Sequence, residues 1–148
     1  MRIIVDSREQ APFSFNGFNC EVKSGTLSSG DYSIAGFEDI VAIERKSLPD
    51  FISCLTTGRE RFMREMERLR GFQSAVIVVE SPFSDLASGR YRSKLDSKIA
   101  VQSVISIMQN YRMPFFFAET RKEAEKFVFD FLRHFCRHAL ARYKAVSK

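Results

Sequence analysis

The stretch that decides the fold of this chain is GDYSIAGFEDIVAIERKSLPD, which occupies residues 30–50. Two alternating strand patterns in it flank a turn of glycine, aromatic and acidic residues at 36–39. A hairpin folded about the midpoint of that turn sets Asp31 directly opposite Glu44. Because strand side chains repeat every two residues, Lys46 shares the face of Glu44. The sequence therefore predicts that two carboxylates and an amine converge on one face of a sheet.

This triplet has two chemical interpretations. Adjacent carboxylates repel each other unless a cation lies between them, and hard oxygen ligands suit Mg²⁺ or Mn²⁺ better than zinc. A metal held there would polarise a phosphodiester and activate water, while Lys46 would orient that water or neutralise phosphate oxygens. The reaction indicated is hydrolysis of a nucleic-acid backbone. The alternative is a cross-strand salt bridge on a solvated face, and the triplet by itself leaves both open.

The whole segment resembles the signature of the XPF-type nuclease domain, a branch of the PD-(D/E)XK superfamily. The residues that carry the resemblance are Gly30-Asp31-Tyr32, Glu44-Arg45-Lys46, Asp50, the opening strand and acidic turn at 3–9, Gly58-Arg59 and the apolar strand at 75–80. The match covers residues 1–120. It implies an α/β fold in which helices flank a mixed central β-sheet, as in restriction endonucleases.

The resemblance also implies an activity and its partners. It implies metal-dependent endonucleolytic cleavage of DNA, at branched or junction structures, in repair or recombination, with Mg²⁺ or Mn²⁺ as cofactor. It also implies a homodimer. Many relatives join this domain to tandem helix-hairpin-helix units, for which the residues after 120 leave no room, so a protein partner could supply substrate recognition here. The site members it implies are Asp6, Asp31, Glu44, Arg45, Lys46 and Asp50, with Asp6, Asp31 and Glu44 as metal ligands.

Several of these site members also have structural interpretations. Asp6 ends a strand and could simply begin a turn. Strand alternation points Arg45 away from its neighbours, so that it packs under the site, pairs with a carboxylate or reaches phosphate around a strand edge. Asp50 fits the third position of a helix with Ser47 as N-cap, which would also bring a positive helix end toward substrate. Glu80, at a strand end, is expected to be solvated.

Arginine residues are the candidate nucleic-acid contacts. In a helix predicted over 59–70, Arg61, Arg64 and Arg68 fall on one stripe. Together with Arg8 and Arg59, these three are the candidate contacts, because arginine suits bidentate binding of phosphate. Intrahelical pairs, Glu60 with Arg64 and Glu67 with Arg70, are an equal alternative, each contributing about 0.2–0.5 kcal/mol.

Length and composition fit one domain spanning 1–148, with 121–148 as a basic C-terminal helix, since 148 residues at 45% hydrophobic content bury a substantial core. No apolar run is long enough to cross a membrane, and the start enters a strand directly, so an intracellular location is expected, cytoplasmic, nucleoid or nuclear. Residues 1–120 hold 15 basic and 15 acidic residues, whereas 121–148 hold 8 and 3. That basic tail would attract phosphate, or form an ordinary solvated helix.

The C-terminal helix carries an aromatic stripe, which contains Phe127, Phe131, Phe135 and Ala139. Such a stripe is usually core, but on a terminal helix a second copy of the chain could share it. His134, Cys136 and His138 do not share one helix face, so no zinc site is expected there. The three cysteines have no disulfide or zinc spacing.

Hydrophobic periodicity predicts the remaining elements. Strands are predicted near residues 2–6, 19–24, 31–35, 40–46, 74–80 and 114–118, and helices near 48–56, 59–70, 97–111 and 121–143. Hairpins should contribute antiparallel neighbours, and the later strand-helix-strand segments parallel ones. Residues 81–93 are predicted as a polar connection.

Two other functions remain open at this stage. The first is a catalytically silent DNA-binding or dimerisation module of the same fold, although Asp31, Glu44 and Lys46 are all present. The second is an RNA-processing nuclease, since phosphate chemistry does not distinguish the sugar.

Overall fold

A six-stranded mixed sheet forms the centre of the computed structural model, which describes residues 1–147, and its strand order is β2-β1-β3-β4-β5-β6. The strands are β1 (Arg2–Asp6), β2 (Glu21–Gly25), β3 (Tyr32–Ile34), β4 (Val41–Ser47), β5 (Ser74–Glu80) and β6 (Phe115–Phe117). All six were predicted, with ends that differ by at most two residues.

The predicted hairpin is the antiparallel pair β3–β4, in which Tyr32 lies opposite Ile43. The same register brings Asp31 alongside Glu44, and the Asp31 backbone N–H donates to the Ile43 carbonyl at 2.7 Å. β1 is antiparallel to β3 and parallel to β2, while β5 and β6 continue parallel from β4. The hairpin register and the parallel arrangement of the later strands are therefore confirmed.

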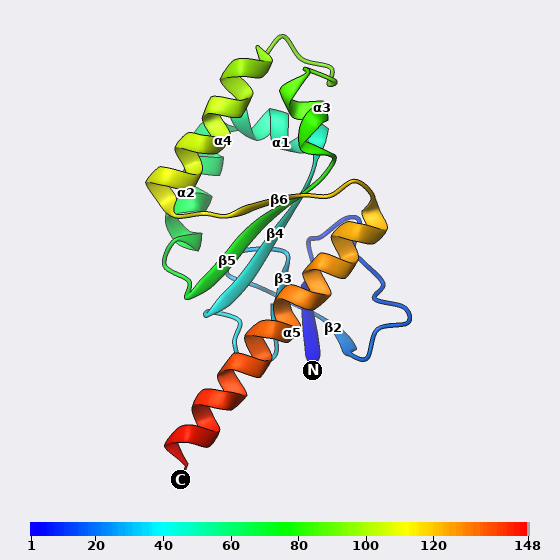
Figure 1. Cartoon of the computed structure of the whole chain (residues 1–148), viewed down its shortest axis with the longest axis vertical. Helices are drawn as coiled ribbons and strands as arrows, with labels where there is room; N and C mark the ends of the chain where they lie inside the picture. The colour runs from blue at the N-terminus through cyan, green and yellow to red at the C-terminus, as the bar shows by residue number, and fades with distance from the viewer. Residues whose placement is uncertain (148) are drawn as a thin grey trace.

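Helices cover both faces of the sheet, as Figure 1 shows. They are α1 (Leu48–Leu55), α2 (Arg59–Leu69), α3 (Phe83–Ala87), α4 (Ser97–Tyr111) and α5 (Arg121–Val146). The first four lie together beyond one face, whereas α5 crosses the other face and its C-terminal end extends past the sheet (Figure 1). This α/β architecture confirms the predicted fold class.

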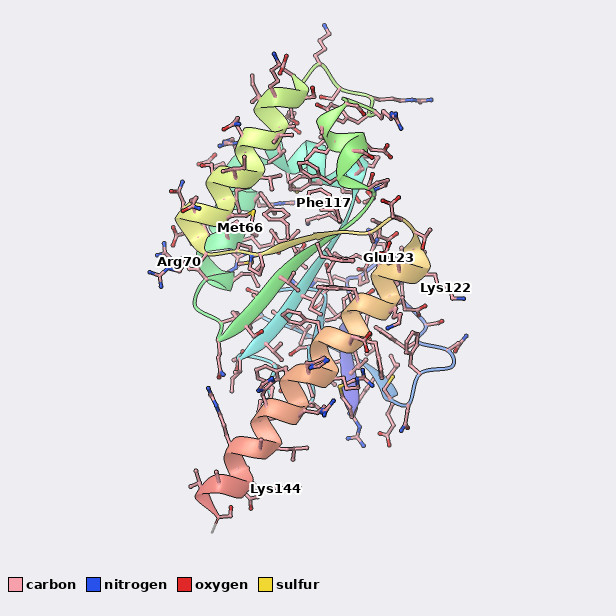
Figure 2. All side chains as sticks on the ribbon, viewed as in Figure 1. Met66, Arg70, Phe117, Lys122, Glu123 and Lys144 are labelled. Carbon is pink, nitrogen blue, oxygen red and sulfur yellow. The ribbon has the colours of Figure 1, made fainter. Side chains whose placement is uncertain are left out.

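Each face of the sheet has its own apolar core. Apolar side chains of α1–α4 pack on one face, where Met66 and Phe117 lie between helices and sheet (Figure 2). On the other face, Val128 and Leu132 of α5 are fully buried against the strands. Each core contains helix residues spaced three or four apart, which is why periodicity alone located the long helices.

The short helix α3 was not predicted, because it lies in the segment expected to be a polar connection. Its five residues give too little sequence for helical periodicity. Leu86, which has no exposed surface, anchors it to the core beneath.

Helix starts follow local capping chemistry. The side chains of Ser47, Asp96 and Thr120 accept hydrogen bonds from backbone N–H groups in the first turns of α1, α4 and α5. Asp50 occupies the third position of α1, as predicted, and its N–H donates to the Ser47 hydroxyl at 3.2 Å. Within residues 1–147, no helix has the length and apolar character needed to span a bilayer.

Replacing Phe51 by Ala should lower the free energy of unfolding by about 3–5 kcal/mol. Phe51 is fully buried and its ring lies edge-on to the rings of Phe62 and Phe115, so truncation leaves a cavity between α1 and the sheet. Urea denaturation followed by circular dichroism measures the change. Ile99→Ala, at a side chain that is 58% exposed, is the control and should change stability by less than about 0.5 kcal/mol. A loss for Phe51→Ala no larger than the control would contradict the assigned packing.

Candidate active site

A cavity of about 670 Å³ opens where the hairpin meets α1, α2 and the loop after β1. Its lining residues are Arg8, Glu9, Gln10, Asp31, Glu44, Arg45, Lys46, Asp50, Ser53, Cys54, Thr57, Gly58, Arg61, Phe62 and Glu65. The structure thus brings together five of the six predicted site members, and only Asp6 is not among the lining residues.

Asp31 and Glu44 enter the cavity from neighbouring strands. The Asp31 carboxylate accepts the Arg45 backbone N–H at 2.7 Å, and Glu44 is 4% exposed. Burial, followed by repulsion from Glu9 and Glu65, raises the pKa of Asp31 to about 6. Burial and then repulsion from Asp31 and Glu65 raise the pKa of Glu44 well above its usual value. These carboxylates therefore lie in a poorly solvated site with excess negative charge.

Lys46 supplies a cation to this group. Its Nζ lies 2.6 Å from the Glu44 Oε1 and 6.0 Å from the centre of the Phe62 ring. Burial alone would lower the pKa of Lys46, but attraction to Glu44 raises it above the ordinary value, so the amine stays charged. One ammonium group balances only part of the charge of the surrounding carboxylates.

Glu65 of α2 is a further acidic residue at this cavity, and sequence reasoning missed it. It lines the same cavity as Glu44, and its nearby negative charge contributes to the raised pKa of Glu44. Glu65 is one helical turn after Arg61, which also lines the cavity. The signal that could have found Glu65 was an acid within the arginine stripe of α2, the second helix after β4.

Arg45 takes the carboxylate-pairing role among its three predicted alternatives. Its guanidinium pairs with Glu9 at 2.7 Å and with Glu80 at 3.1 Å, and the Arg45 side chain is only 10% exposed. Glu80 was expected to be solvated, which is wrong: its side chain is 14% exposed, because Arg121 also binds it at 2.8 Å. The sequence separation of these partners hid the contact.

Asp6 is turned toward the loop that follows its strand. One carboxylate oxygen accepts from the backbone N–H and Nε of Arg8, at 2.9 and 2.8 Å. The other accepts from Arg8 Nη2 at 3.0 Å and from the Leu27 N–H at 2.8 Å. Both oxygens of Asp6 are thus engaged, and they connect the loop that contains Arg8 to the loop that contains Leu27. This arrangement corresponds to the structural, turn-forming interpretation of Asp6.

The candidate arginines are spread over different surfaces. Arg8 and Arg61 line the cavity, whereas Arg59 and Arg64 line a neighbouring depression on α2. Arg64 also lies 3.5 Å from Glu60, and Arg68 donates to the Ser29 hydroxyl at 3.4 Å. No residue of α5 lines the cavity, so the basic residues of this helix lie on a different part of the molecule.

Among residues 1–147, no three His, Cys, Asp or Glu side chains are arranged so that they could hold a metal ion together. Asp31 and Glu44 lie in the cavity, while Asp6 is engaged by Arg8. The three-carboxylate set Asp6, Asp31 and Glu44 is therefore not assembled in this structure.

Known proteins match this chain both in sequence pattern and in fold. The sequence pattern of the ERCC4 domain matches residues 5–131, so the chain belongs to the ERCC4 domain family. No curated protein sequence matches the chain. The chain is an XPF-type nuclease domain, which confirms the resemblance seen in the sequence.

The solved structures with a similar fold include two of XPF from Aeropyrum pernix. The first has a TM-score of 0.75 and 22% identity, covering 97% of this chain and 69% of that one. The second, a complex with DNA, has a TM-score of 0.72 and 22% identity, covering 92% of this chain and 65% of that one. The chain therefore spans about two thirds of their length.

Replacing Asp6 by Asn should lower the free energy of unfolding at pH 7 by about 1–2 kcal/mol, a value reduced for the solvent exposure of Arg8. Hydrogen bonds from Arg8 hold the pKa of Asp6 at about 2, below its ordinary 3.8. Its stabilising effect is therefore complete above pH 3.8 and is lost as the pH falls toward 2.

Urea denaturation of both proteins in chelator, at pH 7 and at intervals down to pH 3, tests this expectation. The difference between Asp6→Asn and wild type should narrow in acid. A constant difference would mean that charge on Asp6 is not what stabilises the fold.

Proposed function

We propose that this domain is a metal-dependent DNA endonuclease that hydrolyses phosphodiester bonds at branched or junction DNA. The observation that carries the proposal is the meeting of Asp31, Glu44 and Lys46 in one cavity of an XPF-type nuclease domain. A solvated cross-strand salt bridge does not account for it, because Glu44 is buried and Glu65 adds a further carboxyl group to the same cavity.

The chemistry of the donor set fits a hard divalent cation. Asp31 and Glu44 would hold Mg²⁺ or Mn²⁺ through carboxylate oxygens, and the unbalanced negative charge around them favours such an ion. Bound there, the ion would supply Lewis-acid polarisation of the phosphoryl group and a more acidic water molecule.

The chain's own residues have distinct tasks in this proposal. Lys46, charged and directed into the cavity, would neutralise a phosphate oxygen or orient the attacking water. Arg8 and Arg61, at the cavity wall with exposed side chains, would contact backbone phosphates on either side of the scissile bond. Asp50, which is exposed in the first turn of α1, also lines the cavity.

DNA is the proposed polymer because one of the similar Aeropyrum pernix XPF structures is a complex with DNA. The preference for branched DNA rests on the ERCC4 family assignment. A silent module of the same fold is the alternative, and the assembled Asp31, Glu44 and Lys46 favour the enzyme over it.

We also infer that the domain forms a homodimer through α5. A groove of about 680 Å³ along that helix is lined by Phe127, Phe131, Phe135 and Ala139, together with Phe37 and Ile40 from the hairpin turn. The apolar surface continues past the sheet, where Leu140 is 58% exposed and Val146 87% exposed. A second copy of α5 would cover both parts.

Asp31→Asn and Lys46→Met should each reduce the rate of DNA cleavage by about 100-fold or more, because charge in the reacting centre is lost. Rates would be measured on labelled duplex, forked, flapped, four-way and single-stranded DNA, and on matching RNA, with Mg²⁺, Mn²⁺ or chelator. Asp39→Asn, an exposed acid at the far end of the same hairpin, is the matched control and should cut like wild type.

Unchanged cutting by Asp31→Asn or Lys46→Met would refute their roles. Binding of forked DNA without any cutting, in every metal, would instead favour the silent module. Preferential cutting of RNA would overturn the proposed substrate.

Phe131→Glu should shift the protein from dimer to monomer in sedimentation velocity, because a charge cannot be buried unpaired between two α5 helices. Ile105→Glu, at an exposed apolar residue of α4, should leave the dimer intact. A wild-type protein that sediments as a monomer at all tested concentrations would exclude the dimer.

A further inference from the structure

We propose that Glu9 and Arg45 are positioning residues of this site, which act as one buried ionic unit and do not touch substrate. The proposal rests on the nuclease function proposed above. It concerns an ion network of Glu9, Arg45, Glu80 and Arg121, in which Glu9 and Arg45 form part of the cavity wall and Glu80 and Arg121 lie behind them.

The Arg45 guanidinium is fully committed on three sides. Its Nε donates to Glu9 Oε2 at 2.8 Å, and its Nη2 donates to Glu9 Oε1 at 2.7 Å, which is a bidentate pair. Its Nη1 donates to Glu80 Oε1 at 3.1 Å. The exposed fractions of the Arg45 and Glu9 side chains are 10% and 5%. A group paired and buried to this degree is poorly placed to bind a phosphate.

The backbone of the same residue holds a site carboxylate. The Arg45 N–H donates to Asp31 Oδ2 at 2.7 Å, while the side chain of Arg45 holds Glu9. Arg45 therefore links Asp31 to the loop that forms the facing wall. A displacement of Arg45 would move both.

That loop, residues 8–13, is also fastened from its other end. The Arg121 Nη2 donates to the carbonyl groups of Ala11 and Pro12, at 2.8 and 3.0 Å. Its guanidinium lies 4.7 Å from the centre of the Phe13 ring, and its Nη1 donates to Glu80 at 2.8 Å. The first residue of α5 thus locks the cavity wall against the end of β5.

The balance of charges explains why these residues act together. Two carboxylates and two guanidinium groups leave the network neutral, so its burial is tolerated only while all partners are present. Lysine cannot replace Arg45, because a single ammonium cannot make the bidentate contact with Glu9 and also reach Glu80.

The test compares Glu9→Gln, Arg45→Lys and the double variant. Each single variant should lower kcat for DNA cleavage by about 10–100-fold, because small displacements of reacting groups are costly. KM, the Kd for DNA and its salt dependence should stay within about twofold of wild type. The double variant should be no slower than the slower single variant, as expected for one unit.

Two controls accompany these variants. Arg2→Gln breaks an ion pair with Glu21 at the far end of β1, where both side chains are more than half exposed, and should leave kcat unchanged. Urea denaturation establishes that each variant is folded at the assay temperature. Arg121→Gln, at the outer edge of the network, should lower kcat by a few fold and keeps the test available if Arg45→Lys does not fold.

Different results would overturn the proposal. A weaker Kd and a salt slope reduced by about one, with kcat retained, would make Arg45 a phosphate contact. Unchanged kcat in folded Glu9→Gln would also overturn it, as would multiplicative losses in the double variant.

Nuclear magnetic resonance separates this proposal from the proposed function. If the wild-type protein cuts no nucleic acid, the nuclease proposal fails, but the resonance measurement still tests whether Glu9 and Arg45 act as one unit. The Arg45 Nε–H and backbone N–H signals should be protected from exchange and should shift together in Glu9→Gln. Independent responses of the two signals would overturn the coupling of Glu9 to Asp31.

Discussion

The pairing of β3 with β4 is the constraint on which the rest of this molecule depends. β3 has only three residues, yet its register with β4 decides that Asp31 meets Glu44. A slip of one residue would turn the site carboxylate of β4 to the opposite face of the sheet. Burial prevents the slip: the first three residues of β4 are fully buried, and the Ser33 hydroxyl donates to the Val41 carbonyl at 2.6 Å. The buried apolar residues at the start of β4 thus fix the orientation of the polar residues that follow them in the same strand.

The environment of the site follows from that register. β4 lies in the middle of the sheet, so its polar residues enter a cavity that α1 and α2 screen from water. Low solvation raises the pKa values of Asp31 and Glu44, while Lys46 keeps its charge beside them. The same low solvation would strengthen the interaction of these groups with a cation or with a phosphate. Stability and proposed chemistry therefore depend on one buried strand.

Helix α5 connects the opposite side of the sheet to this site. Val128 and Leu132 close the second core, and Arg121 at the helix start reaches the wall of the cavity. Lys144, by contrast, lies on the part of α5 that extends past the sheet (Figure 2). The basic residues of α5 are thereby separated from the cavity, apart from Arg121 at its edge. Proximity in the sequence to a basic tail was not a guide to proximity in space.

The sequence by itself determined the six strands, the helices other than α3, the hairpin register and the group formed by Asp31, Glu44 and Lys46. It could do so because alternation and helical periodicity depend only on residues near one another in the chain. The five-residue helix α3 and the position of Asp6 were outside its reach, since a short polar segment and a strand-ending acid each permit several structures. Only the tertiary structure decided that Glu65 lines the same cavity as Glu44 and that Glu9, Arg45, Glu80 and Arg121 form one network. The partners in that network are up to 41 residues apart. Their contacts arise from the packing of the sheet against α2 and α5, which no local pattern encodes.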